Sequence, residues 1–589
     1  MSTIREIAES AQPIAAAETP ATEKKKKPAK KKTSSSSQPD AVQLPEDCPV
    51  VPLGINGDTY YYIDASRQLR EISAEKHSRL GLLALFNQRS EYLWNTWPRQ
   101  NDQGAVTGWR PELVAEALMG ACAREGLLDV DNRVRGPGAW ADDDGQLVLH
   151  CGDVIYDGAD AGNPGRIGRY IYHAAPPIPH PYQGKTDTAA ADELRMLFCT
   201  WEWARPQVDP FLLLGWIGAS MIGGALKWRP MVWITGDRGT GKSTLQEVIN
   251  HLHGDGLLQV ADPTAAGLWQ RAKRASLPIA IDELEPEGDS RKNANIIKLA
   301  RLAASGASMV RGGSDHKGTT FTVRSCFLFS SVLIPPMQPA EISRMAILSL
   351  NELRADAKPP HLEPKKLAEI SAIFRKRMME QWPRLADTLD AYRGALQAAG
   401  HTSRGADQFG TLLACMDLLL YDDIPSANAL AGWGEKLKWS TLAEAENATS
   451  DSERCISHLL SSICDTYKDG KRRTVGSWIE QAADRWKGAD FTEADKVLGA
   501  MGIRVQRPRV HGQPTELLIA NAHQGLAHIY RDTVWASLPG SSGVWVQSIR
   551  RVPGAEASKS STNFGGAPSR YTRLPLDAIL PPNGKEGAE

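Results

Sequence analysis

Apolar residues in the central part of the chain fall into short runs separated by amphipathic stretches. Runs such as Val232–Ile234, Pro278–Ile281 and 326–329 have the length of buried strands, and stretches with helical spacing lie between them, as in Asn293–Ala304. Strands that alternate with helices predict a parallel sheet, because each crossover must return the chain to the same edge. The pattern therefore predicts an α/β core over residues 227–355.

The regions on either side have other patterns. Residues 48–173 combine a hairpin turning at Asn56–Asp58, a helix over Glu112–Glu125 and short extended segments, which predicts a small α+β domain. Residues 451–522 run as three short helices followed by a hairpin, the order of a winged-helix domain. Helical spacing dominates 356–450, to which we assign packing and lid roles.

Changes in composition mark the remaining boundaries. Residues 1–47 are rich in alanine, proline and serine around a lysine run, which is typical of a disordered basic tail. The proline-rich segment Ala174–Tyr182 opens a linker and helical lead-in over 174–226. Residues 523–589 form a C-terminal extension without an assigned fold.

Composition and charge limit the class of protein. Hydrophobic residues make up 42% of the 589 residues, as in ordinary globular proteins, and a net charge of -1 means that any nucleic-acid contact must come from local basic patches. Scattered cysteines without a C-x-x-C pair, and no secretory signal, favour a cytoplasmic protein. The apolar stretch Phe211–Leu226 has 16 residues, short of the roughly 20 that span a bilayer, so we expect a buried helix and no membrane.

A glycine-rich turn follows the apolar run at 231–234 and has the spacing of a phosphate-binding loop. Gly236 and Gly241 frame four residues, and Lys242 and Ser243 complete the pattern G-x-x-x-x-G-K-[ST]. Backbone N–H groups of such a loop surround nucleotide phosphates at a helix N-terminus, the lysine reaches the β and γ phosphates, and the serine hydroxyl ligates Mg²⁺. The residues predicted to bind ATP are Gly236, Asp237, Arg238, Gly239, Thr240, Gly241, Lys242, Ser243 and Thr244.

Asp282 and Glu283 end the next long apolar run, forty residues after Lys242. This is the arrangement of a Walker B strand, in which Asp282 joins Ser243 in the Mg²⁺ shell and Glu283 orients and deprotonates the attacking water. A glutamate beside the metal-shell aspartate suits activation of water. ATP hydrolysis is therefore favoured over transfer of phosphate to a small molecule.

Further motifs follow in order: a hairpin over 308–323, a strand that ends in serines, and an arginine before the last strand. This order resembles the superfamily 3 helicases of phage and plasmid replication proteins, including those of primase-helicase type, within the AAA+ ATPases. The resemblance implies a ring of subunits, with a hexamer expected, whose hairpin contacts single-stranded DNA through Arg311, His316 and Lys317. It also implies that Arg344 acts on the ATP of a neighbouring subunit, and that Ser331 takes a sensor position usually held by asparagine.

Two other groups of residues bear on nucleic acid. Arg507 and Arg509 make the predicted wing basic, so both are predicted DNA contacts. Asp129 and Asp131 are spaced by two and His150 follows, which resembles the metal-binding pair and histidine of archaeo-eukaryotic-type primases. Carboxylates spaced by two on one strand face the same side and would share Mg²⁺. An ordinary acidic turn is the alternative.

The favoured function is an ATP-dependent DNA helicase or translocase that acts on single-stranded or forked DNA in phage, plasmid or prophage replication. A separate primase is a candidate partner. Two alternatives stay open. One is an ATP-switched initiator or regulatory DNA-binding ATPase without processive unwinding, and the other is a bifunctional primase-helicase with metal at Asp129 and Asp131.

Overall fold

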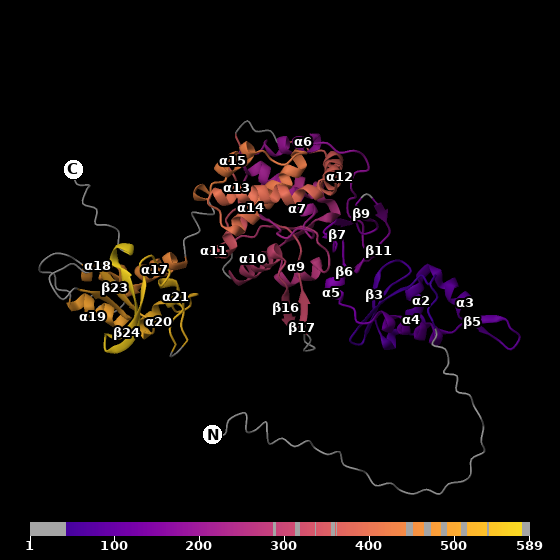
Figure 1. Cartoon of the computed structure of the whole chain (residues 1–589), viewed down its shortest axis with the longest axis horizontal. Helices are drawn as coiled ribbons and strands as arrows, with labels where there is room; N and C mark the ends of the chain where they lie inside the picture. The colour runs from indigo at the N-terminus through magenta and orange to yellow at the C-terminus, as the bar shows by residue number, and fades with distance from the viewer. Residues whose placement is uncertain are drawn as a thin grey trace, which may run out of the picture.

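The computed structural model describes residues 43–158, 160–286, 290–312, 318–335, 337–354, 360, 362–442, 451–464, 473–483, 492–507, 515–538 and 541–579. Within them the chain forms an N-terminal module, a central body built on a parallel sheet, and a C-terminal unit (Figure 1). The predicted tail lies almost wholly outside the described residues, as do His316, Lys317 and Arg509.

The central body contains a five-stranded sheet whose paired strands are all parallel, which confirms the predicted α/β class. Its order is β14-β15-β18-β13-β19. One strand, β18, therefore separates the strand before the glycine-rich loop, β13, from the strand that ends in Asp282, β15. The strands are β13 (Met231–Gly236), β14 (Leu258–Ala261), β15 (Ile279–Asp282), β18 (Phe327–Ser331) and β19 (Met345–Leu350).

Both faces of this sheet are buried, and alternate residues of each strand pack on different faces. Val232 and Ile234 belong to one core, whereas Met231 and Trp233 belong to the other. Strands buried on both faces need continuous apolar runs, which explains the pattern in the sequence. The second core contains α9 (Ala265–Ala272) and α10 (Ser290–Ser305). The first contains α6 (Ala189–Phe198), α7 (Asp209–Met221), α8 (Lys242–His253), α12 (Pro364–Glu380), α13 (Leu385–Ala398) and α14 (Ser403–Leu420).

Helix α7 is the buried helix expected from the apolar stretch after residue 210. It crosses α14 at Gly215, where a Cβ atom would lie 2.0 Å from the carbonyl oxygen of Leu412. Glycine at this position lets the two backbones touch. Among the described helices, none combines the length and the apolarity needed to cross a bilayer.

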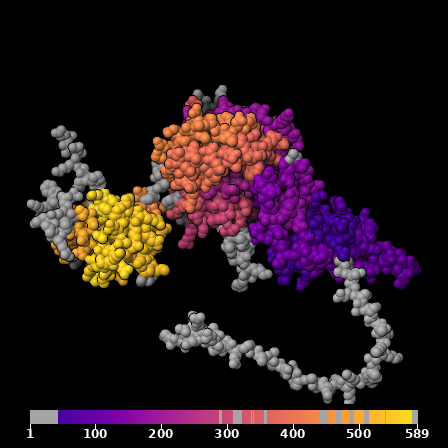
Figure 2. Space-filling model, viewed as in Figure 1, coloured from indigo at the N-terminus to yellow at the C-terminus, as the bar shows by residue number. Residues whose placement is uncertain are grey.

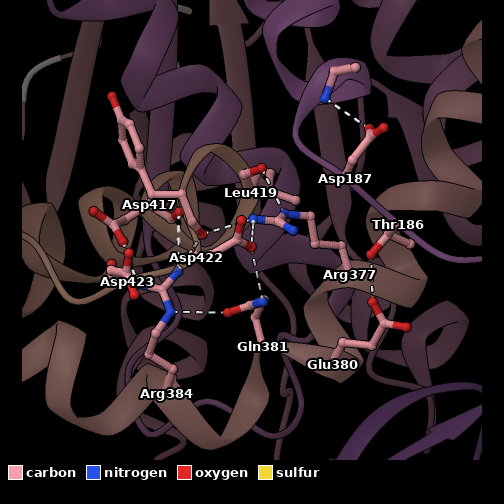
Figure 3. A network of polar contacts seen from close by, with 12 residues as sticks. Thr186, Asp187, Arg377, Glu380, Gln381, Arg384, Asp417, Leu419, Asp422 and Asp423 are labelled. Carbon is pink, nitrogen blue, oxygen red and sulfur yellow. Dashed lines mark hydrogen bonds and ion pairs between the residues drawn. The ribbon is translucent and has the colours of Figure 1, made fainter.

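A polar network joins α12, α13 and the end of α14 (Figure 3). Arg384 Nη1 donates to Asp417 Oδ1 at 2.7 Å, and the Tyr392 hydroxyl donates to Asp417 Oδ2 at 2.9 Å. Arg377 and Arg384 each donate to the carbonyl oxygen of Tyr421 at 2.8 Å. The last carbonyls of a helix have no partner within it, so these guanidinium groups satisfy the end of α14. The helices predicted in the lid region therefore pack into the central body.

The N-terminal module has two parts. In the first, β1 (Val51–Asn56), β2 (Thr59–Ile63) and β3 (Leu69–Ser73) form an antiparallel sheet with the predicted turn, and α4 (Pro111–Glu125) shares a core with it. Shorter elements complete this part: α2 (Arg79–Phe86), α3 (Ser90–Thr96), β4 (Pro98–Gln100) and β5 (Val106–Trp109).

The second part follows the short helix α5 (Val130–Arg133) and packs on the central body. Ala139, Leu147 and Leu149 belong to the same core as α7 and α8, and Figure 2 shows the two regions in continuous contact. The region 48–173 is thus not one independent domain. Its strands are β6 (Val134–Arg135), β7 (Gly138–Ala141), β8 (Leu147–His150), β9 (Ile155–Asp157), β10 (Asp160–Gly162), β11 (Gly165–Ile167) and β12 (Tyr170–Tyr172).

The C-terminal unit has the predicted order of three helices and an antiparallel strand pair, but it continues further. Strand β25 pairs with β23, and β24 pairs with β25, so the sheet order is β22-β23-β25-β24. Residues from 455 to 576 share one core, and the expected boundary at 522 does not separate two folded parts. The elements are α17 (Asp451–Ser461), α18 (Val475–Ala483), α19 (Thr492–Met501), β22 (Ile503–Gln506), β23 (Glu516–Ala520), α20 (Gln524–Ile529), α21 (Trp545–Ile549), β24 (Glu556–Phe564) and β25 (Ala567–Pro575).

Candidate functional site

The carboxyl ends of the central strands meet at one edge of the sheet and line a cleft of about 960 Å³. The glycine-rich loop follows β13, Asp282 and Glu283 follow β15, and Ser330 and Ser331 end β18. Parallel strands bring these segments together because their carboxyl ends share an edge, where α/β proteins bind ligands. The lining residues are Arg238, Gly239, Thr240, Gly241, Lys242, Ser243, Thr244, Asp282, Glu283, Glu285, Ser330, Ser331, Val332, Leu333 and Leu353.

The loop requires glycine for two reasons. Gly239 and Gly241 have φ angles of 82° and 84°, in the left-handed region that favours glycine. A Cβ atom on Gly241 would also lie 2.8 Å from Nε1 of Trp201. That indole N–H donates to the Gly241 carbonyl at 3.0 Å. Trp201 comes from the segment between α6 and α7, and nothing in its local sequence predicted this contact.

Helix α8 begins directly after the loop, so the backbone N–H groups of its first turn have no partners within the helix. Lys242 Nζ donates to the carbonyl oxygens of Gly236 and Asp237, at 2.5 and 2.9 Å. The buried Thr240 hydroxyl donates to Asp237 O at 2.9 Å. The loop thus holds a cation and free N–H donors beside the cleft, an arrangement that suits an anion.

Asp282 is tied to the helix that follows the loop. Its Oδ1 accepts from Gln246 Nε2 at 2.8 Å and from the Glu283 N–H at 3.0 Å. Gln246 lies on α8, so this bond joins the end of β15 to the loop helix. Glu283 is exposed and has a φ of 56°, which is uncommon for a residue other than glycine. Backbone strain of this kind clusters at functional sites.

Residues at the end of β18 have contacts that the sequence did not predict. Ser331 is 2% exposed, and its hydroxyl accepts from Trp233 Nε1 at 2.8 Å. Glu285 uses both carboxylate oxygens to accept the N–H groups of Val332 and Leu333, at 2.5 and 3.0 Å. Ser331 therefore lines the cleft with its oxygen already in use, and Glu285 orders the loop after β18.

Arg344 lies at the opposite edge of the sheet. It precedes β19, whose first residue, Met345, is paired with Met231, the first residue of β13. Its guanidinium donates to the carbonyl of Ala340 and lies 5.8 Å from the centre of the Trp228 ring. Burial lowers the pKa of Arg344 to about 10. Arg344 thus takes no part in the cleft of its own chain.

The predicted DNA-contacting residues lie in two places. Strands β16 (Met309–Gly312) and β17 (Gly318–Phe321) form the predicted hairpin, with Arg311 paired to Thr319 along the backbone. Arg507 in the C-terminal unit donates from both terminal nitrogens to Asp495, at 2.5 and 3.1 Å. The charge of Arg507 is therefore balanced within its own unit.

The expectation of a metal site at Asp129 and Asp131 is wrong. The two residues do not lie on a strand: Asp129 is the N-cap of α5, where its carboxylate accepts from the backbone N–H and the side-chain amide of Asn132, and Asp131 lies inside that helix. His150 is fully buried, its two ring nitrogens contact His173 O at 2.9 Å and Gly152 N at 3.1 Å, and burial lowers its pKa to about 4. Among the described residues, no group of three His, Cys, Asp or Glu side chains is placed to hold a metal.

Comparison with known proteins adds little beyond these contacts. No family model matches the chain, and no curated protein matches it. The A-form apo structure of the NrS-1 C-terminal region is similar over 89% of this chain and 96% of that chain, with 10% identity and a TM-score of 0.34. The apo structure of the NrS-1 C-terminal region (305–718) covers 89% and 95%, with 11% identity and a TM-score of 0.32. These scores are too low to assign a role to the chain.

Proposed function

We propose that this protein hydrolyses ATP and uses the reaction to unwind or translocate along DNA in replication. The observation that supports the proposal is the cleft itself, in which loop residues 238–244, Asp282 and Glu283 lie at one edge of the sheet. A strand before the loop and a buried strand before the acidic pair are the context that these motifs require. The same context would not arise from an isolated glycine turn.

The donor set fits ATP with Mg²⁺. N–H groups of the loop and the first turn of α8 would bind phosphate oxygens, and Lys242 would exchange its loop carbonyls for them. Ser243 is exposed at the cleft, and among the described residues Asp282 Oδ2 has no hydrogen bond, so both would serve the cation. Bound Mg²⁺ would neutralise charge that develops on the phosphates.

Glu283 would orient and deprotonate the attacking water, because its exposed carboxylate lies at the cleft next to Asp282. Arg344 cannot serve the same cleft, since it lies at the opposite edge of the sheet. We therefore propose that it acts on the ATP of a neighbouring subunit in a ring, where a guanidinium would stabilise charge on the phosphate oxygens. The hairpin of β16 and β17 would contact the DNA strand.

Steady-state hydrolysis and strand displacement from a forked duplex test the proposal together. Glu283→Gln should abolish turnover and keep ATP binding, Lys242→Ala should weaken both, and Glu247→Gln, an exposed residue elsewhere on α8, should change neither. Turnover that persists in Glu283→Gln would exclude Glu283 as the base. Mixing Lys242→Ala with Arg344→Ala subunits should restore some hydrolysis if Arg344 acts between subunits, and no recovery would argue against a shared site.

The order of helices and strands in the C-terminal unit favours one alternative, a DNA-binding ATPase that switches state without unwinding. In that case DNA would not stimulate hydrolysis and no strand would be displaced, although ATP binding would still depend on Lys242.

A further inference from the structure

A second cavity, of about 530 Å³, lies between the N-terminal module and the central body. Four segments of the sequence form its walls: 129–140, 169–170, the turn after α9, and the segment after β17. Six of its thirteen lining residues carry a positive charge and two carry a negative charge. The positive side chains are those of Arg133, Arg135, Arg169, Lys273, Arg274 and Arg324.

Three of these guanidinium groups, those of Arg133, Arg135 and Arg324, have no carboxylate partner among the described residues, and the last two lie deepest in the fold. Arg135 donates to the Tyr172 hydroxyl at 2.8 Å, and its guanidinium lies 3.2 Å from the centre of the Tyr170 ring. Arg324 is partly buried, and its pKa is lowered by burial and then by the positive charge of Arg135. By contrast, Arg169 is paired with Asp143. A concave site with three unneutralised cations favours an anionic ligand.

The walls of the cavity are fixed to each other by backbone contacts. The N–H of Gly136 donates to Arg274 O at 2.9 Å, and the N–H of Ser276 donates to Pro137 O at 2.9 Å. A Cβ atom on Gly138 would lie 2.2 Å from Ser276 Oγ, so only glycine allows this approach. The cations are therefore held in place by the fold, which lowers the cost of ordering them around a ligand.

The aromatic residues of the cavity do not offer stacking platforms for bases. Trp140 and Tyr170 are each 8% exposed, and the guanidinium of Arg135 lies against the Tyr170 ring. Exposed ring faces are what single-stranded nucleic-acid binding uses for base stacking. This cavity can therefore recognise phosphate charge but not bases.

The position of the cavity links it to the hairpin. Thr322 and Arg324 follow directly after β17, and the Thr322 hydroxyl hydrogen-bonds Ser308 Oγ, just before β16, at 2.9 Å. A strand of nucleic acid in contact with the hairpin would reach the cavity at the hairpin base.

We propose that this cavity binds a backbone phosphate of single-stranded nucleic acid, with Arg324 and Arg135 as the central donors and Arg133 and Lys273 at the rim. This proposal depends on the proposed function in one respect: the ligand is the nucleic-acid strand that contacts the hairpin of β16 and β17. It does not need ATP, so it stands or fails separately from the assignment of the cleft.

Fluorescence anisotropy with a labelled thymidine oligonucleotide, without nucleotide and across a salt series, tests it on the full chain. Arg324→Gln should weaken binding about tenfold, the value of one charge-assisted hydrogen bond. It should also reduce the slope of log affinity against log salt by about 0.7, because one contact to a single strand is lost. Arg324→Lys should keep the slope, and Arg271→Gln, an exposed residue of α9 outside the cavity, should change neither quantity.

Equal affinity and equal slope in Arg324→Gln would overturn the proposal. If that variant proves unstable in a thermal melt, Lys273→Gln, at an exposed position on the rim, should show a smaller loss with the same decrease in slope. Pyrophosphate binding that depends on Arg324, combined with unchanged oligonucleotide affinity, would assign the cavity to a free phosphate compound and exclude nucleic acid. Hydrolysis measured without DNA should be unchanged in Arg324→Gln, which keeps this test distinct from that of the cleft.

Discussion

Replacing Arg384 with leucine should strongly destabilise the helical side of the central body. The Arg384 side chain is 12% exposed and that of Asp417 is 2% exposed, with 2.7 Å between Nη1 and Oδ1. In the variant, the Asp417 carboxylate would keep the Tyr392 hydroxyl as a donor but would lose its neutralising charge. Removing one partner of a buried ion pair costs about 3–5 kcal/mol. For a domain of this size that lowers the melting temperature by about 6–20 °C.

The pH dependence gives a second measure of the same effect. Burial raises the pKa of Asp417 above its ordinary value, and Arg384 opposes the shift. Arg384 stabilises the charged form of the Asp417 carboxylate, so removing Arg384 would raise the pKa of Asp417 further. The loss in the free energy of unfolding should thus be largest near neutral pH and shrink as the pH falls and Asp417 takes up a proton.

Thermal unfolding followed by circular dichroism, at about pH 7.5 and about pH 5, measures both effects. Arg384→Leu with Asp417→Asn should recover most of the loss, since the buried carboxylate that Arg384 paired with is then removed as well. Arg166→Leu removes a surface pair with Glu125, whose side chains are 40% and 37% exposed, and should cost no more than about 1 kcal/mol. A loss in Arg384→Leu as small as that control, or one that does not change with pH, would refute the reasoning.

Three further predictions follow from single contacts. Trp201→Phe should weaken ATP binding about three- to tenfold by calorimetry, with little change in melting temperature, because one hydrogen bond to the loop is lost; equal affinity would exclude a role for the indole. His253 is fully buried, which lowers its pKa to about 3, so its contribution to stability should be complete above about pH 6.5 and fall by about 1.4 kcal/mol per pH unit between about pH 6.5 and about pH 3. Because His150 is also buried with a lowered pKa, His253→Gln should reduce the slope of denaturant-derived stability against pH by about 1.4 kcal/mol per unit and not abolish it, and an unchanged slope would contradict the assignment. Gly215→Ala should lower the free energy of unfolding in urea by at least about 2 kcal/mol, because the new Cβ would meet Leu412 O. Gly120→Ala, whose new Cβ would have its nearest atom at 3.6 Å, should raise it by about 0.5–1 kcal/mol. Equal effects of the two variants would contradict the close helix crossing.

The parts of the cleft that could be predicted from the sequence are those with local patterns. The spacing from Gly236 to Ser243 and the apolar run before Asp282 are both contained in short windows. Their meeting at one edge follows from parallel strands, since carboxyl ends then coincide. Trp201 and Gln246 could not be found in this way, because a tryptophan among 17 and a mid-helix glutamine acquire their roles only through contacts across the fold.

The predicted metal site at Asp129 and Asp131 is not formed because the same local pattern is compatible with two structures. The spacing of Asp129 and Asp131 fits a strand face and also a helix start, and aspartate is a preferred N-cap residue, which the structure shows at Asp129. The fold of the residues after 522 cannot be predicted from local sequence, because β25 pairs with β23, roughly fifty residues earlier, and such pairing leaves no pattern in nearby positions. The basic cavity has no local pattern for the same reason, because its cations come from four segments of the sequence.

The core on the loop side of the central sheet also bears on how such a chain can be inherited. Helices from 189–221 and from 364–420, which flank the motifs in the sequence, bury the same face of the sheet. A recombination event that moved only residues 227–355 into another gene would transfer both nucleotide motifs. One face of the sheet would then be exposed to solvent in the product, which would aggregate or be degraded. Selection would therefore preserve exchanges that carry both flanks together, so the heritable module is about twice as long as its motifs suggest.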